Sequence, residues 1–170
     1  MCDTHASRSS PTPCIEFNII GYNNTSLANS CTTYSAAPSM TWAPLDTAGS
    51  FLITGSQYQR LLSFPSPIVK ATLSHYESWA ASSPYNGELG PNDATKQSTV
   101  LFDVVAAALL LPSRGAWFDI VTIDVYVDGE GYTKRGQNEE CGGVAEEAVG
   151  WKEGGEEALA AYVVDLLVEQ

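Results

Sequence analysis

The chain has 170 residues, of which 44% are hydrophobic and 10% aromatic. This composition is typical of one globular domain and is too apolar for an intrinsically disordered chain. Eight basic and twenty acidic residues give a formal net charge of −12, and such a surface repels phosphate backbones and anionic lipid headgroups, which excludes nucleic acid and membrane surfaces as expected partners. Because the sequence contains neither an apolar run of the ~18–20 residues that a membrane span needs nor a secretory signal pattern, we expect a cytoplasmic protein.

Acidic residues crowd the last quarter of the chain, where we expect them to lie on a solvated face or edge. They are Glu139, Glu140, Glu146, Glu147, Glu153, Glu156 and Glu157. The cysteines show no C-x-x-C spacing, so the sequence indicates neither a zinc site nor a thioredoxin-like redox pair.

The N-terminal part predicts a tail followed by a strand–helix–strand unit. Residues 1–13 are rich in Ser, Thr and Pro, which predicts a flexible tail. The run IEFNII, residues 15–20, predicts a strand with Glu16 and Asn18 as polar side chains. After a weakly helical stretch, the run MTWAPL, residues 40–45, predicts a second buried strand.

The middle of the chain predicts three helices. The first opens at Thr54 with the spacing of a capping box and stops before Pro65. The second runs from Ser66 to Ser82 and is followed by a loop rich in Gly, Pro and Asn. The third, over residues 98–111, is rich in Ala and Leu and has Asp103 as its only charged residue.

The C-terminal part predicts a β-hairpin and a helix. The run IVTIDVYV, residues 120–127, alternates apolar and polar side chains and continues through a Gly-rich turn into a second strand near Thr133. Helical spacing returns over residues 156–168. We therefore expect residues 14–170 to form an α/β domain, part of a mostly parallel sheet with flanking helices and a C-terminal β-hairpin plus helix.

Polar side chains interrupt several apolar runs, at Glu16, Asn18, Asp46 and Asp103. A carboxylate in an apolar setting is costly unless a cation, a metal or a hydrogen-bond donor compensates it, and such groups gather at functional sites. Asp46 follows a predicted parallel strand, at the end where α/β folds hold their ligands. In the alternative, structural interpretation, Asp46 caps the next helix and Asp103 hydrogen-bonds a buried backbone donor.

Four runs, in this order and with similar gaps, resemble the nucleoside hydrolase family of the inosine/uridine-preferring type. They are E-F-N (16–18), P-L-D-T (44–47), TGSQYQRLL (54–62) and S-T-V-L-F-D-V-V-A (98–106). The later segment IDVYVDGEGYTKRG (123–136) also resembles the acidic strand that follows these runs in the family. The resemblance extends over roughly Pro13 to Val168 and concerns the C-terminal half of the family's domain.

The resemblance implies a ribose and calcium site at the C-terminal edge of a parallel sheet. Glu16 and Asn18 correspond to residues that hydrogen-bond ribose hydroxyls, and Asp103 corresponds to a carboxylate ligand of Ca²⁺. Asp46 is expected to shape the site, and Phe102 stands where many members carry a His. The reaction that the resemblance implies is hydrolysis of the N-glycosidic bond of a ribonucleoside by a calcium-bound water. We expect Glu16, Asn18, Asp46 and Asp103 to lie close together.

The sequence departs from the family pattern at positions on which the family's activity depends. The D-T-D-x-G-x-D-D cluster, which supplies the family's general base and most of its calcium ligands, has no counterpart in this sequence, and residues 21–25 do not follow the family's D-P-E-A-A. We therefore expect a truncated chain that binds calcium weakly and is inactive by itself.

Three hypotheses follow. The chain is one part of a split hydrolase whose N-terminal partner chain supplies the missing cluster, or a non-catalytic module that binds nucleosides or proteins, or an unrelated α/β domain. In each of the first two cases a homo-oligomer or a partner chain is expected, because loss of the N-terminal strands would expose a sheet edge.

Overall fold

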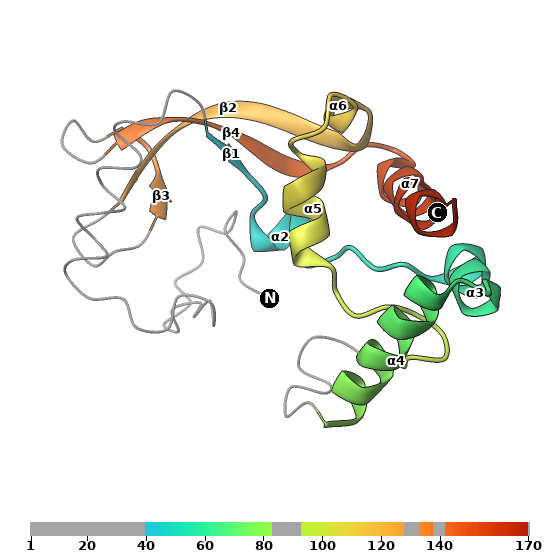
Figure 1. The fold of residues 1–170 in the computed structure, drawn as a ribbon. Helices are drawn as coiled ribbons and strands as arrows, with labels where there is room; N and C mark the ends of the chain where they lie inside the picture. The colour runs from blue at the N-terminus through green and yellow to red at the C-terminus, as the bar shows by residue number, and fades with distance from the viewer. Residues whose placement is uncertain (1–39, 83–92, 128–132, 138–141, 170) are drawn as a thin grey trace. The chain divides into compact units, whose positions relative to one another are not determined.

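The computed structural model describes residues 40–82, 93–127, 133–137 and 142–169 (Figure 1). These residues group into two compact units. The first unit contains the described residues up to Asp46 together with Ile120–Val149, and the second contains Thr47–Asp119 together with the described residues from Gly150 onward.

The first unit is built on a sheet of four strands in the order β1-β4-β2-β3 (Figure 1). The strands are β1 (Thr41–Trp42), β2 (Phe118–Val127), β3 (Thr133–Arg135) and β4 (Gly142–Trp151). β1 pairs in parallel with β4, with Thr41 opposite Glu146, and β2 pairs antiparallel with β3, with Val125 opposite Arg135. The sheet is therefore mixed.

The mixture of helices and strands confirms the predicted α/β character, and the antiparallel β2–β3 pair confirms the predicted hairpin. The strand predicted over residues 40–45 is shorter, because Pro44 cannot donate to a ladder and the short helix α2 (Leu45–Ala48) begins directly after it. β4 was not predicted. The predicted tail and first strand, residues 1–13 and 15–20, lie outside the described residues.

The second unit contains the helices that follow α2 in the chain, shown in Figure 1. They are α3 (Gly55–Ser63), α4 (Pro67–Ser82), α5 (Phe102–Ala108), α6 (Arg114–Trp117) and α7 (Gly155–Val168). α3 packs against α4 and α7, and α6 packs against α7. Side chains that are almost completely buried form the core between these elements; they are Phe51, Tyr58, Val69, Val105, Phe118, Leu159 and Val164.

The structure confirms the predicted helices over α3, α4 and α7 to within a residue or two. The helix predicted over residues 98–111 is shorter, because its first residues are extended and bonded to another segment. The N–H of Ser98 donates to the carbonyl of Ile53, and the N–H of Leu101 donates to the carbonyl of Phe51. Because of these bonds, α5 begins only at Phe102.

An aromatic cluster stabilises the second unit where α7 begins. The ring of Trp151 lies 4.6 Å from that of Phe118 and 5.5 Å from that of Phe51, measured between ring centroids. The ring of Trp117 lies 5.3 Å from that of Tyr162 of α7. Aromatic pairs at these separations add to the free energy of burial, so they stabilise the attachment of α7 to segments distant in sequence.

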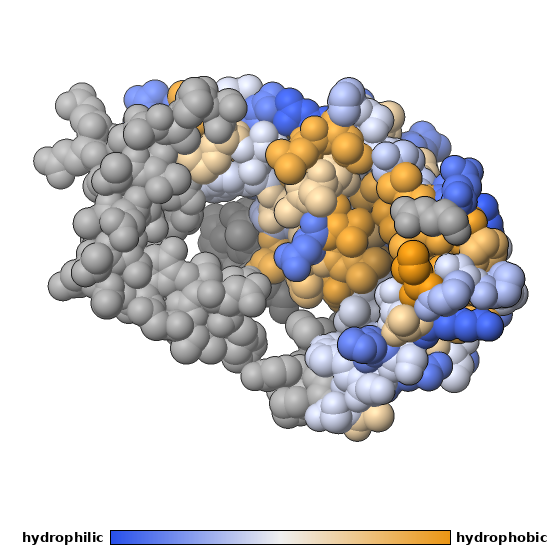
Figure 2. All heavy atoms as spheres, in the orientation of Figure 1, coloured by the Kyte–Doolittle hydropathy of each residue, from blue (hydrophilic) through white to orange (hydrophobic). Residues whose placement is uncertain are grey.

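Apolar residues gather around α5 and on its side toward α7 in the face of the molecule that Figure 2 displays. Among the described residues, no helix has the length and apolar character required to cross a membrane.

Candidate functional site

The residues predicted for the ribose and calcium site are not assembled within the described part of the chain. Glu16 and Asn18 lie outside the described residues, so their clustering with Asp46 and Asp103 stays a prediction. Asp46 is half-buried in α2, four residues beyond the end of β1, and belongs to the first unit. Phe102 and Asp103 form the start of α5 in the second unit.

Asp103 is exposed, so water solvates its carboxylate. Ca²⁺ takes ~6–8 oxygen ligands, and in the described ranges no group of three or more His, Cys, Asp or Glu side chains could hold a metal ion. Asp103 together with the described residues therefore does not form a calcium donor set, and the predicted calcium site stays a prediction that depends on residues outside these ranges.

Glu147 of β4 is a buried carboxylate that sequence reasoning placed on a solvated face. Its side chain is 3% exposed, and Arg135 of β3 holds it with two hydrogen bonds, Nε to Oε2 at 2.9 Å and Nη2 to Oε1 at 2.6 Å. Hydrogen bonding to Glu147 raises the pKa of Arg135, and the charge of Asp46 contributes to this shift. A bidentate pair of this kind connects β3 to β4 across β2.

A pocket of about 400 Å³ lies between the first turns of α3 and α7 in the second unit. Its lining combines polar and apolar groups and includes Leu52, Thr54, Gly55, Ser56, Gln57, Glu156, Glu157 and Ala160. The volume falls within the ~300–1,000 Å³ range of small-molecule sites. We take this α3/α7 pocket as the candidate functional site.

The α3 side of the pocket provides backbone donors, because the first N–H groups of an α-helix have no partner within the helix. Thr54 is the N-cap residue but its side chain makes no capping hydrogen bond, and within the described ranges the buried side-chain oxygen of Gln57 has no partner. The predicted capping box is therefore wrong. Gly55, the first residue of α3, has a left-handed φ of 55°, a backbone conformation that favours glycine.

The α7 side of the pocket provides carboxylates. Burial raises the pKa of Glu156, the negative charge of Glu157 raises it further, and a hydrogen bond from the backbone N–H of Leu52 acts in the opposite direction. Gly154 precedes the helix with a left-handed φ of 70° and supplies no capping side chain. Glu156 is therefore a half-buried acid at the positive end of a helix dipole, next to a second acid.

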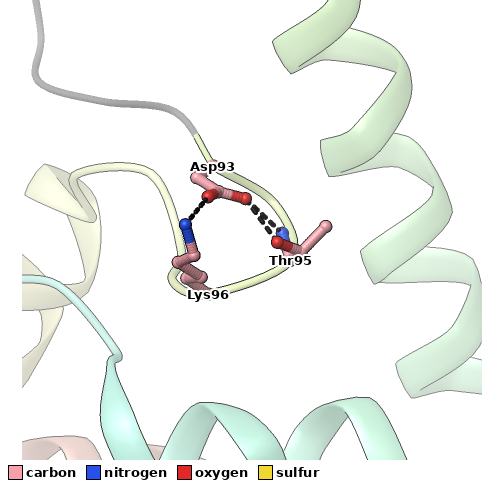
Figure 3. Close-up of polar contacts among 3 residues, drawn as sticks. All are labelled: Asp93, Thr95 and Lys96. Atoms are coloured by element: carbon pink, nitrogen blue, oxygen red, sulfur yellow. Dashed lines mark hydrogen bonds and ion pairs between the residues drawn. The ribbon is translucent and has the colours of Figure 1, made fainter.

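A tight turn holds the chain beside α3, as Figure 3 shows. The carboxylate of Asp93 accepts hydrogen bonds from the side chain and N–H of Thr95 and forms an ion pair with Lys96 at 2.8 Å. The bond from Lys96, followed by those from Thr95, lowers the pKa of Asp93 to about 2. Within this turn the carbonyl of Ala94 accepts a hydrogen bond from the hydroxyl of Tyr58 at 2.8 Å. The turn thus holds the side chain of Tyr58, the residue that follows Gln57.

Sequence reasoning did not find the α3/α7 pocket. The local signals were present, since Gly55 and Gly154 lie at the two helix starts and Glu156 and Glu157 follow the second. From the sequence alone, Gly55 is part of a predicted capping box, Gly154 marks a predicted helix start and the acids are expected on a solvated face.

Comparison with known proteins adds no relative. Neither a protein-family model, nor a curated protein, nor a solved structure matches the chain significantly.

Proposed function

We propose that this chain is a nucleoside-hydrolase-like protein that, by itself, binds a small ligand without hydrolysing it. The observation that carries the proposal is the α3/α7 pocket, whose volume of about 400 Å³ suits a small molecule. The resemblance of the four runs proposes a ribonucleoside as the ligand class.

The finer features of the fold belong to the same proposal. The parallel pairing of β1 with β4 is compatible with a fragment of a mostly parallel sheet. The net charge of −12 supports a protein that does not bind nucleic acid, and we propose that it acts in the cytoplasm.

The absence of hydrolysis is proposed on chemical grounds. Cleavage of an N-glycosidic bond needs an activated water, a proton for the leaving base and stabilisation of the ribosyl cation. The sequence carries no counterpart of the Asp cluster that supplies the base and most metal ligands in the family. Without these groups the barrier rises by many multiples of about 1.4 kcal/mol, each worth tenfold in rate.

A direct test measures binding and turnover in the same samples. We expect inosine or uridine to change the chemical shifts of the α3/α7 pocket in NMR titrations, and we expect no hydrolysis of either nucleoside, or of p-nitrophenyl riboside, above background with or without Ca²⁺. A calcium-dependent turnover near one per second that falls sharply in Asp103→Ala would contradict the non-catalytic proposal. Nucleoside titrations that leave the pocket unchanged would contradict the binding proposal.

The second candidate is the split hydrolase, which the exposure of Asp103 favours. An exposed carboxylate at a helix start is accessible to a metal ion whose other ligands come from a second chain. Under this proposal a partner chain with the D-T-D-x-G-x-D-D cluster, or a second copy of this chain, completes the site. Activity that appears only when such a chain is mixed with this protein, and not with Asp103→Ala, would support it.

A further inference from the structure

The α3/α7 pocket presents both kinds of hydrogen-bonding group. Its donors are the backbone N–H groups of the first turn of α3 and the hydroxyls of Thr54 and Ser56. Its acceptors are the carboxylates of Glu156 and Glu157, and Gln57 also lines the pocket. A ligand hydroxyl both donates and accepts, so it complements this mixed lining.

Charge argues against ionic ligands. An anion would meet the helix N-termini, which attract it, but also Glu156 and Glu157, and the described residues that line the pocket include no Lys, Arg or His. A cation would be attracted by the two carboxylates, but it would face the positive ends of two helix dipoles, each equivalent to about half a charge, and it would leave the N–H donors unsatisfied. A neutral, hydroxylated ligand avoids both conflicts.

Gln57 adds an independent indication. Its Oε1 is buried and has no hydrogen-bond partner among the described residues, although Gln57 also lines the pocket. Buried polar groups are normally satisfied, so an orphaned acceptor calls for an explanation. The terminal torsion of a Gln side chain is broad, and rotation of this carboxamide toward the pocket breaks no hydrogen bond made by Oε1. A ligand O–H there would give Oε1 the partner that the described part of the chain does not supply.

We infer that the α3/α7 pocket binds the hydroxyl groups of a neutral ligand and that Gln57 selects for them by accepting a ligand O–H. The inference rests on the proposed function in one respect, that this pocket is the binding site. It goes further by naming the ligand chemistry and the residue that determines specificity.

The test compares inosine, 2′,3′-dideoxyinosine, inosine 5′-monophosphate and D-ribose on the full chain by NMR and calorimetry. We expect inosine to bind at least tenfold more tightly than dideoxyinosine and than the monophosphate. Gln57→Met should weaken inosine binding by tenfold or more and leave dideoxyinosine binding unchanged. Gln59→Met, at an exposed position two residues later in α3, is the matched control and should behave as the unmodified protein.

Each result decides the inference. Equal affinity for inosine and dideoxyinosine, or an unchanged inosine affinity in Gln57→Met, would overturn it. If D-ribose shifts the resonances of Gln57 and Glu156 while inosine does not, the inference stands and the proposed nucleoside ligand is wrong. If neither probe shifts them, the inference is wrong. Gln57→Met should also keep the unfolding temperature of the unmodified protein, because a lower one would mean that Gln57 already has a partner in the fold.

Discussion

At Gly155, the first residue of α7, the backbone of another segment leaves no room for a side chain. A Cβ added there would lie 2.2 Å from the carbonyl oxygen of Trp117, closer than any real contact. The backbone of Trp117 is itself held, since its carbonyl accepts a hydrogen bond from the N–H of Lys152 at 3.0 Å. The clash therefore cannot be relieved by rotation of a flexible side chain.

We predict that Gly155→Ala destabilises the protein by about 2–3 kcal/mol, as overpacking against fixed backbone does. Gly150→Ala is the matched control, because a Cβ at Gly150 would have nothing within 4 Å. Chemical denaturation followed by tryptophan fluorescence measures both variants. Equal stability of the two variants would mean that the close approach of Gly155 to Trp117 is absent in solution.

At the scale of single elements, the short edge strand β3 depends on one side chain. Arg135 reaches over β2 to Glu147 of β4, and three residues of ladder are otherwise a weak attachment. Removing the cation leaves a buried carboxylate without a partner, which costs ~3–5 kcal/mol in fully buried pairs. The side chain of Arg135 is 40% exposed, so solvent screening reduces this cost.

We predict that Arg135→Met destabilises the protein by about 2 kcal/mol, and that adding Glu147→Met recovers most of the loss. Lys134→Met, on the same strand, is the control. Urea denaturation of the single and double variants forms the thermodynamic cycle. If the two single losses simply add in the double variant, the ion pair does not couple β3 to β4.

The first turn of α7 makes stability depend on pH. Because burial and Glu157 raise the pKa of Glu156, the folded protein retains this proton to higher pH than the unfolded chain does. The free energy of unfolding therefore decreases as pH rises from the ordinary Glu value of 4.5 through the raised folded value. Glu156→Gln should remove this decrease and stabilise the protein relative to the unmodified chain at neutral pH.

Urea denaturation from about pH 4 to pH 8 measures this effect, with Glu153→Gln, an exposed neighbour, as the control. The Glu156→Gln profile should be flatter than both others over this interval. Profiles that run parallel would show that Glu156 titrates alike in the folded and unfolded states.

Local sequence patterns predicted those helices and strands whose conformation depends least on contacts with other segments. The apolar spacing of α4 and α7 and the alternation of β2 are visible within single segments. β4 could not be predicted because its sequence GGVAEEAVGW combines glycines with two adjacent acids. One of these acids, Glu147, is buried, and its charge is compensated by Arg135. The α3/α7 pocket could not be predicted for a similar reason, since Gln57 and Glu156 meet only through the packing of distant segments.

At the scale of the whole molecule, the acidic composition allows a prediction about calcium. A net charge of −12 attracts divalent cations diffusely, but tight binding requires several oxygen ligands at one place. We predict that calorimetry finds no micromolar Ca²⁺ site in the chain alone, and that Asp103→Ala leaves the weak binding unchanged. Micromolar binding that this substitution abolishes would show that residues outside the described ranges complete a site around Asp103.

The packing of α3 against α7 joins the early and the last parts of the chain. An ion pair connects Arg60 to Asp165, and Trp151 donates a hydrogen bond to Ser50. During synthesis the buried face of α3 is made long before the helix that covers it, so this unit completes its core only after α7 has left the ribosome. A nascent chain that stalls before α7 therefore exposes an apolar surface to chaperones and proteases.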